Sequence, residues 1–328
     1  MDALTAPVTN VLIRYDLRAP AFAHARHAEM YATCLEQCAW ADAHGLSTVI
    51  LSEHHGVDDG YLPATVTLAA AIAGRTTRIH ISLAALLVPL HDPIRLAEQL
   101  AVLDLLSGSR VSLVAGLGYR REEFAMAGLD FTRRGQLFEE YIGVMRTAWT
   151  GEPFEWRGRT IRVTPRPAAP PAIVVGGYTA AAARRAARLR LGLHIGMQNP
   201  TLADTYRAEC ARRGFTGGFV VGGSSTAFVH VSEDPERDWA RIAPYALYDG
   251  QTYASWANPA SVAPAQALTI ADIRQSGSYL VITPDECVAL ARSGGLIVFH
   301  PLLCGLPAAL GWASLELFAA KVLPRISG

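Results

Sequence analysis

The residues best suited to acid–base chemistry lie in Ser52-Glu53-His54-His55-Gly56, which follows a β-branched apolar run. A neutral imidazole can accept or deliver a proton near neutral pH. Because side chains alternate along a strand, Glu53 and His55 would share one face, and His54 would take the other. A histidine that only satisfies a backbone group at a strand end fits the same pattern. The segment therefore predicts a candidate proton-transfer residue, for which partners are not visible in sequence.

Two glycine-containing turns could bind a ligand. Gly176-Gly177-Tyr178-Thr179 ends an apolar strand and begins an Ala/Arg-rich helix over 180–190. Paired glycines let the backbone approach a ligand closely, and a helix N-terminus favours phosphate. A simple glycine turn before a helix is the alternative. The other turn, Gly116-Leu117-Gly118-Tyr119-Arg120-Arg121, has arginine where a dinucleotide fingerprint has Gly or Ala, which argues against a Rossmann NAD site.

Small residues and histidines elsewhere give weaker signals. Ala84-Ala85, near the end of a third apolar run, would let a flat ring approach the backbone, although close packing explains the pair equally well. Cys34 and Cys38 would lie on one helix face, and we interpret them as residues of the hydrophobic core. Three further histidines lack zinc-site spacing, so no metal site is predicted: His91, His194 and His300.

Composition narrows the class of protein. The chain has 328 residues, is 51% apolar and 18% charged, and has a formal net charge of zero. These values predict a globular protein and favour neither nucleic acid nor an acidic membrane as a partner. The first residues show no basic region or apolar signal core, and no apolar run reaches membrane-spanning length. Five scattered cysteines argue for a reducing compartment, so we expect a cytoplasmic protein.

Strand and helix patterns alternate along the chain, which predicts a single (β/α)8 TIM barrel domain over residues 1–328. An open doubly wound sheet is the alternative. A β-hairpin over 154–164 precedes the fifth strand, and a helical insertion over 234–279 precedes the eighth. The expected strands are 10–16, 47–53, 78–87, 110–116, 172–177, 193–196, 226–232 and 296–301.

Together these segments resemble the luciferase-like flavin-dependent monooxygenases, the bacterial luciferase superfamily. The resemblance covers nearly the whole chain. Its most specific blocks are Pro89-Leu90-His91-Asp92-Pro93 and Leu106-Ser107-Gly108-Ser109-Arg110. It implies reduced FMN, or in sister groups the deazaflavin F420, at the carboxyl ends of the barrel strands. The glycine turn departs from the family's usual Gly-Gly-x-Ser, so FMN and F420 both remain open.

The resemblance also implies roles for particular residues. His54 matches the histidine that faces the reactive edge of the flavin. Ala84-Ala85 match a position where relatives carry a non-prolyl cis peptide against the ring. Gly116 and Tyr119 match the loop beside the cofactor. The phosphate-binding turn would comprise Gly176, Gly177, Tyr178 and Thr179.

The activity that follows is a two-component monooxygenase. A separate flavin reductase would supply reduced FMN, O2 would add to the flavin as a peroxide adduct, and a small organic substrate would be oxygenated. The alternatives are an F420-dependent hydride transfer without O2 and a non-catalytic flavin-binding relative. The family suggests a homodimer. Substrate contacts are expected from other strand ends, at Tyr15, Asp59, Tyr61, Met197 and His300.

Overall fold

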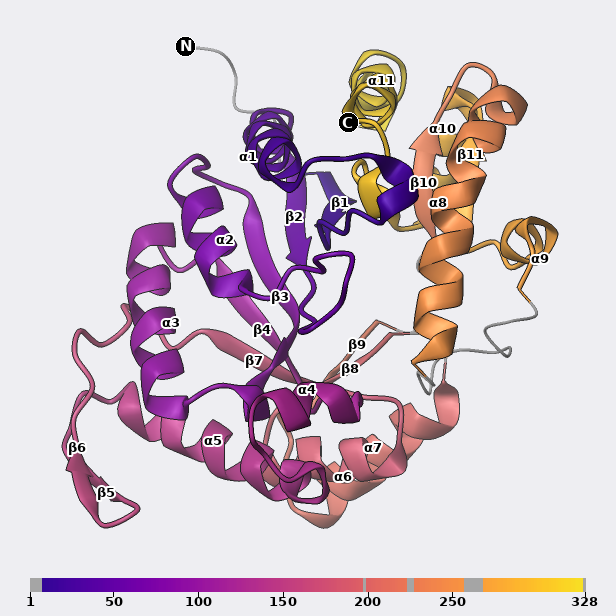
Figure 1. Cartoon of the computed structure of the whole chain (residues 1–328). Coiled ribbons are helices and arrows are strands. Elements are labelled where there is room, and N and C mark those ends of the chain that lie inside the picture. The colour runs from indigo at the N-terminus through magenta and orange to yellow at the C-terminus, as the bar shows by residue number, and fades with distance from the viewer. Residues whose placement is uncertain (1–7, 197–198, 223–226, 257–267, 327–328) are drawn as a thin grey trace.

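The computed structural model describes residues 8–196, 199–222, 227–256 and 268–326, in which a central sheet is surrounded by helices (Figure 1). The sheet has ten strands. They are β1 (Val8–Tyr15), β2 (Leu46–Leu51), β3 (His80–Leu87), β4 (Val111–Gly116), β7 (Ala172–Gly176), β8 (Gly192–Ile195), β9 (Val220–Gly222), β10 (Phe228–Val231), β11 (Tyr279–Ile282) and β12 (Ile297–Phe299).

The order of the strands identifies the architecture. It runs β11-β10-β12-β1-β2-β3-β4-β7-β8-β9, with every neighbouring pair parallel. The last strand, β12, pairs with the first, and Val11 lies opposite Ile297. Successive parallel strands with helices between them, and a last strand beside the first, make a (β/α)8 barrel. The predicted fold class is confirmed, and the doubly wound alternative is excluded.

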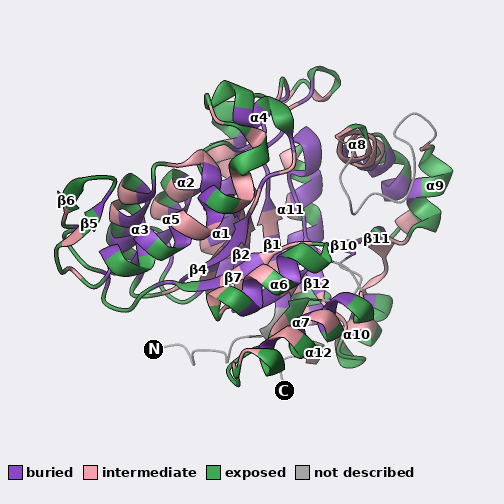
Figure 2. Cartoon of the chain, turned by 90° about the horizontal axis from the view of Figure 1, so that it is seen from below, coloured by how far each residue is buried: buried purple, intermediate pink, exposed green. Residues whose placement is uncertain are grey.

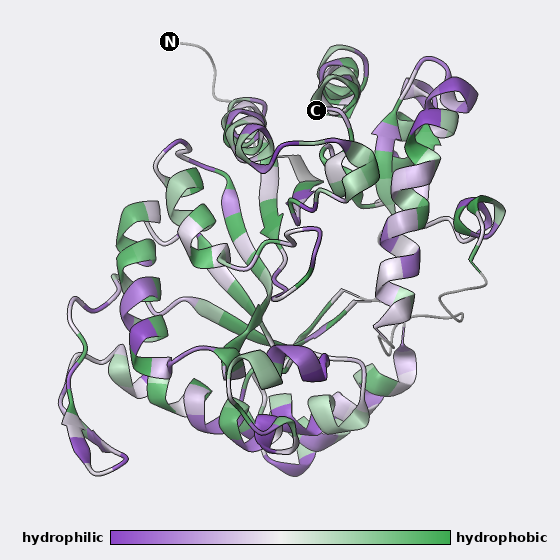
Figure 3. Ribbon diagram, in the orientation of Figure 1, coloured by the Kyte–Doolittle hydropathy of each residue, from purple (hydrophilic) through white to green (hydrophobic). Residues whose placement is uncertain are grey.

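Helices cover the outside of the sheet. Exposed residues gather on their outer faces and buried residues on the strands (Figure 2), and hydropathy divides in the same way (Figure 3). The described helices are α1 (His27–Ala43), α2 (Thr65–Ala73), α3 (Pro93–Ser107), α4 (Arg121–Met126), α5 (Arg134–Ala148), α6 (Ala180–Leu189), α7 (Pro200–Arg212), α8 (Pro235–Ser255), α9 (Ile270–Gln275), α10 (Pro284–Arg292), α11 (Ala308–Leu317) and α12 (Leu323–Ile326). None of them is both long enough and apolar enough to cross a membrane.

Helix ends follow the sequence signals. Asp92 caps α3 by accepting from the backbone N–H groups of Ile94 and Arg95, with proline at the first helical position. Gly108 ends the same helix with φ of 63°, a left-handed conformation that glycine adopts without strain. The predicted capping box joins Thr283 and Glu286 at the start of α10. Local chemistry therefore fixes where these helices begin and end.

Elements outside the eight-unit repeat occur in two places. The antiparallel hairpin of β5 (Phe154–Trp156) and β6 (Arg159–Ile161) turns at Arg157 and Gly158, both with positive φ, as in a type I′ turn. It projects from the barrel beside α3 and α5 (Figure 1). Helices α8 and α9 lie between β10 and β11. The strands β9 and β11 were not expected; each is short and pairs at one end of the sheet.

Alternation along β1 decides which side chains face inward. The Tyr15 hydroxyl donates to Gln37 Oε1 of α1 at 3.0 Å, so Tyr15 points outward into the helix layer. Its neighbour Arg14 therefore points inward, toward the carboxyl ends of the strands. There Arg14 contacts Ser52 after β2 and Tyr253 of α8.

Candidate active site

The candidate site is built at the carboxyl ends of β2, β3 and β4. Strand β2 ends at Leu51, two residues earlier than expected, so Glu53, His54 and His55 lie just beyond the ladder. Glu53 and His55 still contact each other, with 2.7 Å between Glu53 Oε1 and His55 Nε2, and His54 turns elsewhere. The predicted division of the two histidines is confirmed. This edge of a barrel is where catalytic groups usually gather.

His54 is buried, with 6% of its surface exposed, and both ring nitrogens have partners. Its Nδ1 lies 2.7 Å from Glu123 Oε1, and its Nε2 lies 3.2 Å from the Tyr119 hydroxyl. Burial lowers the pKa of His54 more than the Glu123 carboxylate raises it, so the ring is neutral at pH 7. Because a carboxylate only accepts, we assign the single proton to Nδ1, which leaves Nε2 as an acceptor.

Glu123, which sequence reasoning missed, organises this corner. Its Oε1 accepts from His54 Nδ1, from the His55 backbone N–H at 3.0 Å and from Arg120 Nη1 at 3.4 Å. Its Oε2 is buried and has no partner among the described residues. The available signal was a pair of acids opening a helix directly after the glycine loop of β4.

Arg120, one of the two cations in the loop after β4, was not expected beside the histidines. It donates to the His55 carbonyl at 2.9 Å, and its guanidinium lies 4.5 Å from the Trp256 ring centroid. The Trp256 ring in turn lies 4.7 Å from the His54 ring, and Tyr61 packs edge-on against His54 at 4.8 Å. The end of α8 thus brings an aromatic side chain over the candidate proton-transfer residue. Such a cover excludes water from His54.

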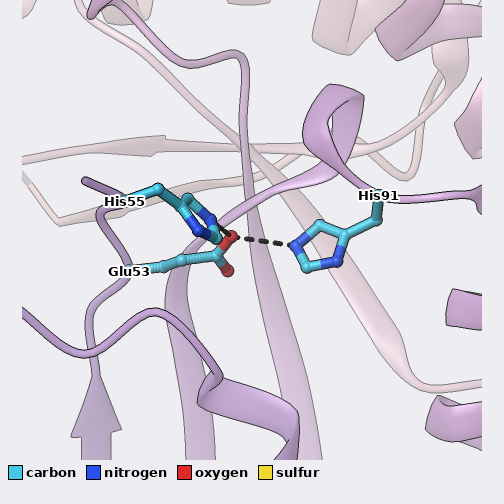
Figure 4. A group of neighbouring side chains, drawn as sticks. All are labelled: Glu53, His55 and His91. Atoms are coloured by element: carbon cyan, nitrogen blue, oxygen red, sulfur yellow. Dashed lines mark hydrogen bonds and ion pairs between the residues drawn. The ribbon is translucent and has the colours of Figure 1, made fainter. Parts of the chain in front are cut away.

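Glu53, His55 and His91 form a second cluster (Figure 4). Glu53 Oε1 lies 2.7 Å from His55 Nε2 and 2.8 Å from His91 Nε2, while Oε2 accepts from Thr65 and from the Leu87 N–H. The three ligand-type atoms lie within 4.8 Å of one another. Hydrogen bonds already engage the carboxylate, which ties the ends of β2 and β3 to α2. The sequence expectation was for no metal site, and we interpret this cluster as a structural network.

This network makes stability depend on pH. Burial alone would raise the pKa of Glu53, but hydrogen bonds from His55 and His91 lower it to about 2, below its ordinary 4.5. Stability from ionised Glu53 is therefore fully present above pH 4.5 and is lost as pH falls toward 2. We expect Glu53→Gln to lower the free energy of unfolding by about 3 kcal/mol at pH 7, and by progressively less below pH 4.5. Urea unfolding at pH 7, 5 and 3.5 measures this.

Glu98→Gln is the matched control, because Glu98 pairs only with the exposed Arg95. Its cost should stay below about 0.5 kcal/mol. An equal loss for both variants at pH 7 would contradict the network.

The expected cofactor residues of β3 and β4 lie against one another. The Ala84–Ala85 peptide is cis, as the family resemblance implied. The Ser52 hydroxyl donates to the Ala84 carbonyl at 2.8 Å and holds it toward β2. A Cβ at Gly116 would lie 2.9 Å from Ala85 Cβ. These small residues keep the backbone accessible to a flat ring.

The turn after β7 is shaped as a tight strand-to-helix connection. A Cβ at Gly177 would lie 2.4 Å from Ala182 Cβ, so only glycine fits. Thr179 caps α6 by accepting from the Ala182 N–H, and Tyr178 packs its hydroxyl beside Gly196. The first turn of α6 carries no acid. The remaining N–H groups of the helix N-terminus, together with Gly176 at the strand end, suit a phosphate.

The structure places the residues expected to contact substrate in different surroundings. Tyr61 lies in the site, against His54. Tyr15 is a correction: it faces Gln37 of α1, because the strand register places Arg14 at the strand ends. Asp59 is buried and engaged, since its Oδ2 accepts from Arg18 Nε at 2.8 Å and from the Tyr248 hydroxyl.

The other two expected substrate residues are less informative. His300 is buried, with its Nε2 3.4 Å from Asp16 Oδ1 and its ring 5.0 Å from that of Phe228. Met197 lies outside the described residues.

Comparisons with known proteins identify the family. A model of the family described as luciferase-like monooxygenase matches residues 17–289. An uncharacterized protein of Mycobacterium tuberculosis is 36% identical over 137 residues, covering 40% of this chain and 48% of that protein. The chain thus spans about half the length of the first curated relatives it matches. Limonene 1,2-monooxygenase of Rhodococcus erythropolis is 26% identical over 322 residues, covering 90% of this chain and 81% of that enzyme.

Solved structures share the fold. The oxygenating constituent of 3,6-diketocamphane monooxygenase from Pseudomonas putida, in complex with FMN, has a TM-score of 0.70 and 18% identity, covering 98% of this chain and 99% of that chain. An F420-dependent secondary alcohol dehydrogenase has a TM-score of 0.69 and 16% identity, covering 97% of this chain and 99% of that chain. Because the family match covers most of its length, the chain belongs to the luciferase-like monooxygenase family of enzymes.

Proposed function

We propose that this chain is a flavin-dependent monooxygenase that uses reduced FMN and O2 to oxygenate a small organic substrate. The observation that carries the proposal is the buried His54–Glu123 pair, which leaves a neutral imidazole Nε2 beside Tyr119. Membership of the family supports monooxygenase chemistry. The FMN bound to the diketocamphane monooxygenase supports the choice of cofactor.

The residues present fit FMN. An anionic phosphate suits the N-terminus of α6, where Thr179 is the cap and no acid lies in the first turn. The isoalloxazine ring suits the ends of β3 and β4, where Ala84, Ala85 and Gly116 have small side chains or none. Both features lie at the carboxyl ends of barrel strands, as one bound cofactor requires.

When bound, reduced FMN supplies the electrons and the reactivity toward O2. The protein orients it, excludes water and controls one proton. Glu123 keeps the proton of His54 on Nδ1, so Nε2 is an acceptor, engaged by the Tyr119 hydroxyl at 3.2 Å, that a reacting group would take over from Tyr119. Tyr119 supplies a hydroxyl whose pKa burial raises, so it remains a donor. Trp256 and Tyr61 cover the imidazole.

The chain also needs a source of reduced FMN and a substrate. The loop Gly116–Arg121 lacks a dinucleotide fingerprint, so we assign the supply of reduced FMN to a separate reductase in the cytoplasm. Small molecules with an apolar body are the first class to assay, because a relative 26% identical over most of the chain is named for limonene.

The test is an anaerobic titration with reduced FMN and, separately, reduced F420. Quenching of the six tryptophans reports binding. We expect saturable binding of FMN, and transfer of labelled oxygen from 18O2 into a product once substrate is present. Binding of F420 with no affinity for FMN would favour the hydride-transfer alternative. Bound FMN without oxygen transfer to any substrate would indicate a non-catalytic relative.

A further inference from the structure

Arg14 is an inward-facing cation that the proposed chemistry does not use. It lies on β1, and the outward position of Tyr15 requires that its own side chain point to the strand ends. Arg14 Nε donates to Ser52 Oγ at 3.1 Å, and Nη2 donates to the hydroxyls of Tyr61 and Tyr253 at 3.3 and 3.0 Å. The side chain remains partly exposed, although Ser52 and Tyr61 are buried.

All these partners are neutral. No carboxylate forms an ion pair with Arg14 among the described residues, whereas Arg18, four positions along, contacts both Asp59 and Asp249. The hydrogen bonds of the half-buried guanidinium go only to hydroxyl groups, and the Asp16 and Asp249 carboxylates act on its charge from farther away. A direct ion pair is the commoner arrangement for such a cation.

The hydrogen-bond donors of this cluster outnumber the acceptors within it. The hydroxyls of Tyr61 and Tyr253 lie 2.6 Å apart, so one donates to the other while both accept from Arg14. Burial raises the pKa of both tyrosines, so both hydroxyls keep their protons. One hydroxyl proton and the two N–H groups of Arg14 Nη1 then have no acceptor among the described residues. The cluster has surplus donors and offers no surplus acceptor.

We propose that Arg14, Tyr61 and Tyr253 form a subsite for an anionic oxygen of the substrate, either a carboxylate or an ionised enol or phenol. This inference rests on the proposed function and deepens it. The Tyr61 ring packs on His54 at 4.8 Å, so an oxygen held by this cluster lies next to the proton-transfer residue. The guanidinium carbon lies 5.1 Å from the Phe228 ring centroid, so the rest of the substrate meets apolar surface. The substrate is an apolar or aromatic body that carries one acidic oxygen.

The probes are 2-naphthoate and its neutral isostere 2-naphthamide, titrated by fluorescence into the full-length chain with and without FMN. We expect wild type to bind the acid at least about tenfold more tightly than the amide. Arg14→Met should abolish this preference, and Arg14→Lys should keep part of it. Tyr253→Phe, which removes a donor but no charge, should weaken binding of the acid by about threefold to tenfold. Arg95→Met, on the exposed face of α3, should change nothing.

Equal affinities of wild type for the acid and the amide would overturn the proposal, as would an undiminished preference in Arg14→Met. If Arg14→Met does not fold, the other two variants decide. An undiminished preference for the acid in Arg14→Lys, together with unweakened acid binding in Tyr253→Phe, would overturn the proposal. Loss of FMN affinity in Arg14→Met with an unchanged preference for naphthoate would assign these donors to the flavin oxygens and sink the substrate subsite. A naphthoate preference that depends on Arg14 in a chain that binds no FMN would sink the proposed function and leave the subsite standing.

Discussion

Replacing Arg18 by methionine is expected to lower the free energy of unfolding by about 3–5 kcal/mol. The Arg18 side chain is fully buried, and its Nε and Nη1 lie 2.8 and 2.6 Å from carboxylate oxygens of Asp59 and Asp249. Methionine fills a similar length but leaves two buried carboxylates without their cation. Each must then protonate or draw in water. Urea unfolding at pH 7, followed by far-ultraviolet circular dichroism, measures the loss.

Arg207→Met is the matched control, because Arg207 pairs with Asp204 on the surface of α7. Exposed ion pairs contribute about 0–1 kcal/mol, so this variant should unfold close to wild type. A loss below about 1 kcal/mol for Arg18→Met would contradict the argument and imply that water already solvates the pair.

The same substitution has a local consequence. Arg18 joins the segment after β1 to Asp249 of α8, and α8 also carries Tyr253, with Trp256 just beyond its end. Without this tie, amide hydrogens over 245–256 should exchange faster, while those of β3 and β4 should be protected as in wild type. Stability and the cover over His54 are thus linked through one buried cation.

The sequence could predict the barrel because each βα unit carries its own signals. Apolar runs, the Asp92-Pro93 start and the Thr283–Glu286 capping box are local, and the structure reproduces them. The strands β9 and β11 were missed because each extends the sheet at one end, outside the eight-unit repeat that the prediction assumed. Length does not set them apart, since β8, β10 and β12 are as short and were expected.

The candidate site was predictable only where its chemistry lies at a strand end. His54 and the cis Ala84–Ala85 peptide are of this kind. Glu123 was not predictable, since it meets His54 across 69 positions of sequence through the packing of α4. Tyr15 was expected at the site, but Arg14 faces it instead. Because side chains alternate along a strand, an error of one residue in the register turns every side chain to the opposite face.

Replacing His54 by glutamine is expected to slow oxygenation by about 10²–10³-fold, with affinity for FMN unchanged within about threefold. Glutamine can still reach Glu123 and Tyr119, but it cannot take up a proton. Stopped-flow absorbance, in which the bound reduced FMN is mixed with O2 and substrate, gives the rate, and tryptophan quenching gives the affinity. A rate within about threefold of wild type would remove His54 from the mechanism.

The pH profile separates a proton-transfer role from a structural one. Burial lowers the pKa of His54, so the neutral ring and the full rate should persist from pH 8 down past pH 6.5, and the rate should fall only below that. Glu123 opposes this shift, because its carboxylate raises the pKa of the imidazole. Glu123→Gln should therefore move the acid limb to still lower pH, in addition to slowing the reaction by about tenfold through loss of ring orientation. An acid limb that stays in place in Glu123→Gln would mean that another group titrates, and one that disappears in His54→Gln would identify the imidazole as its source.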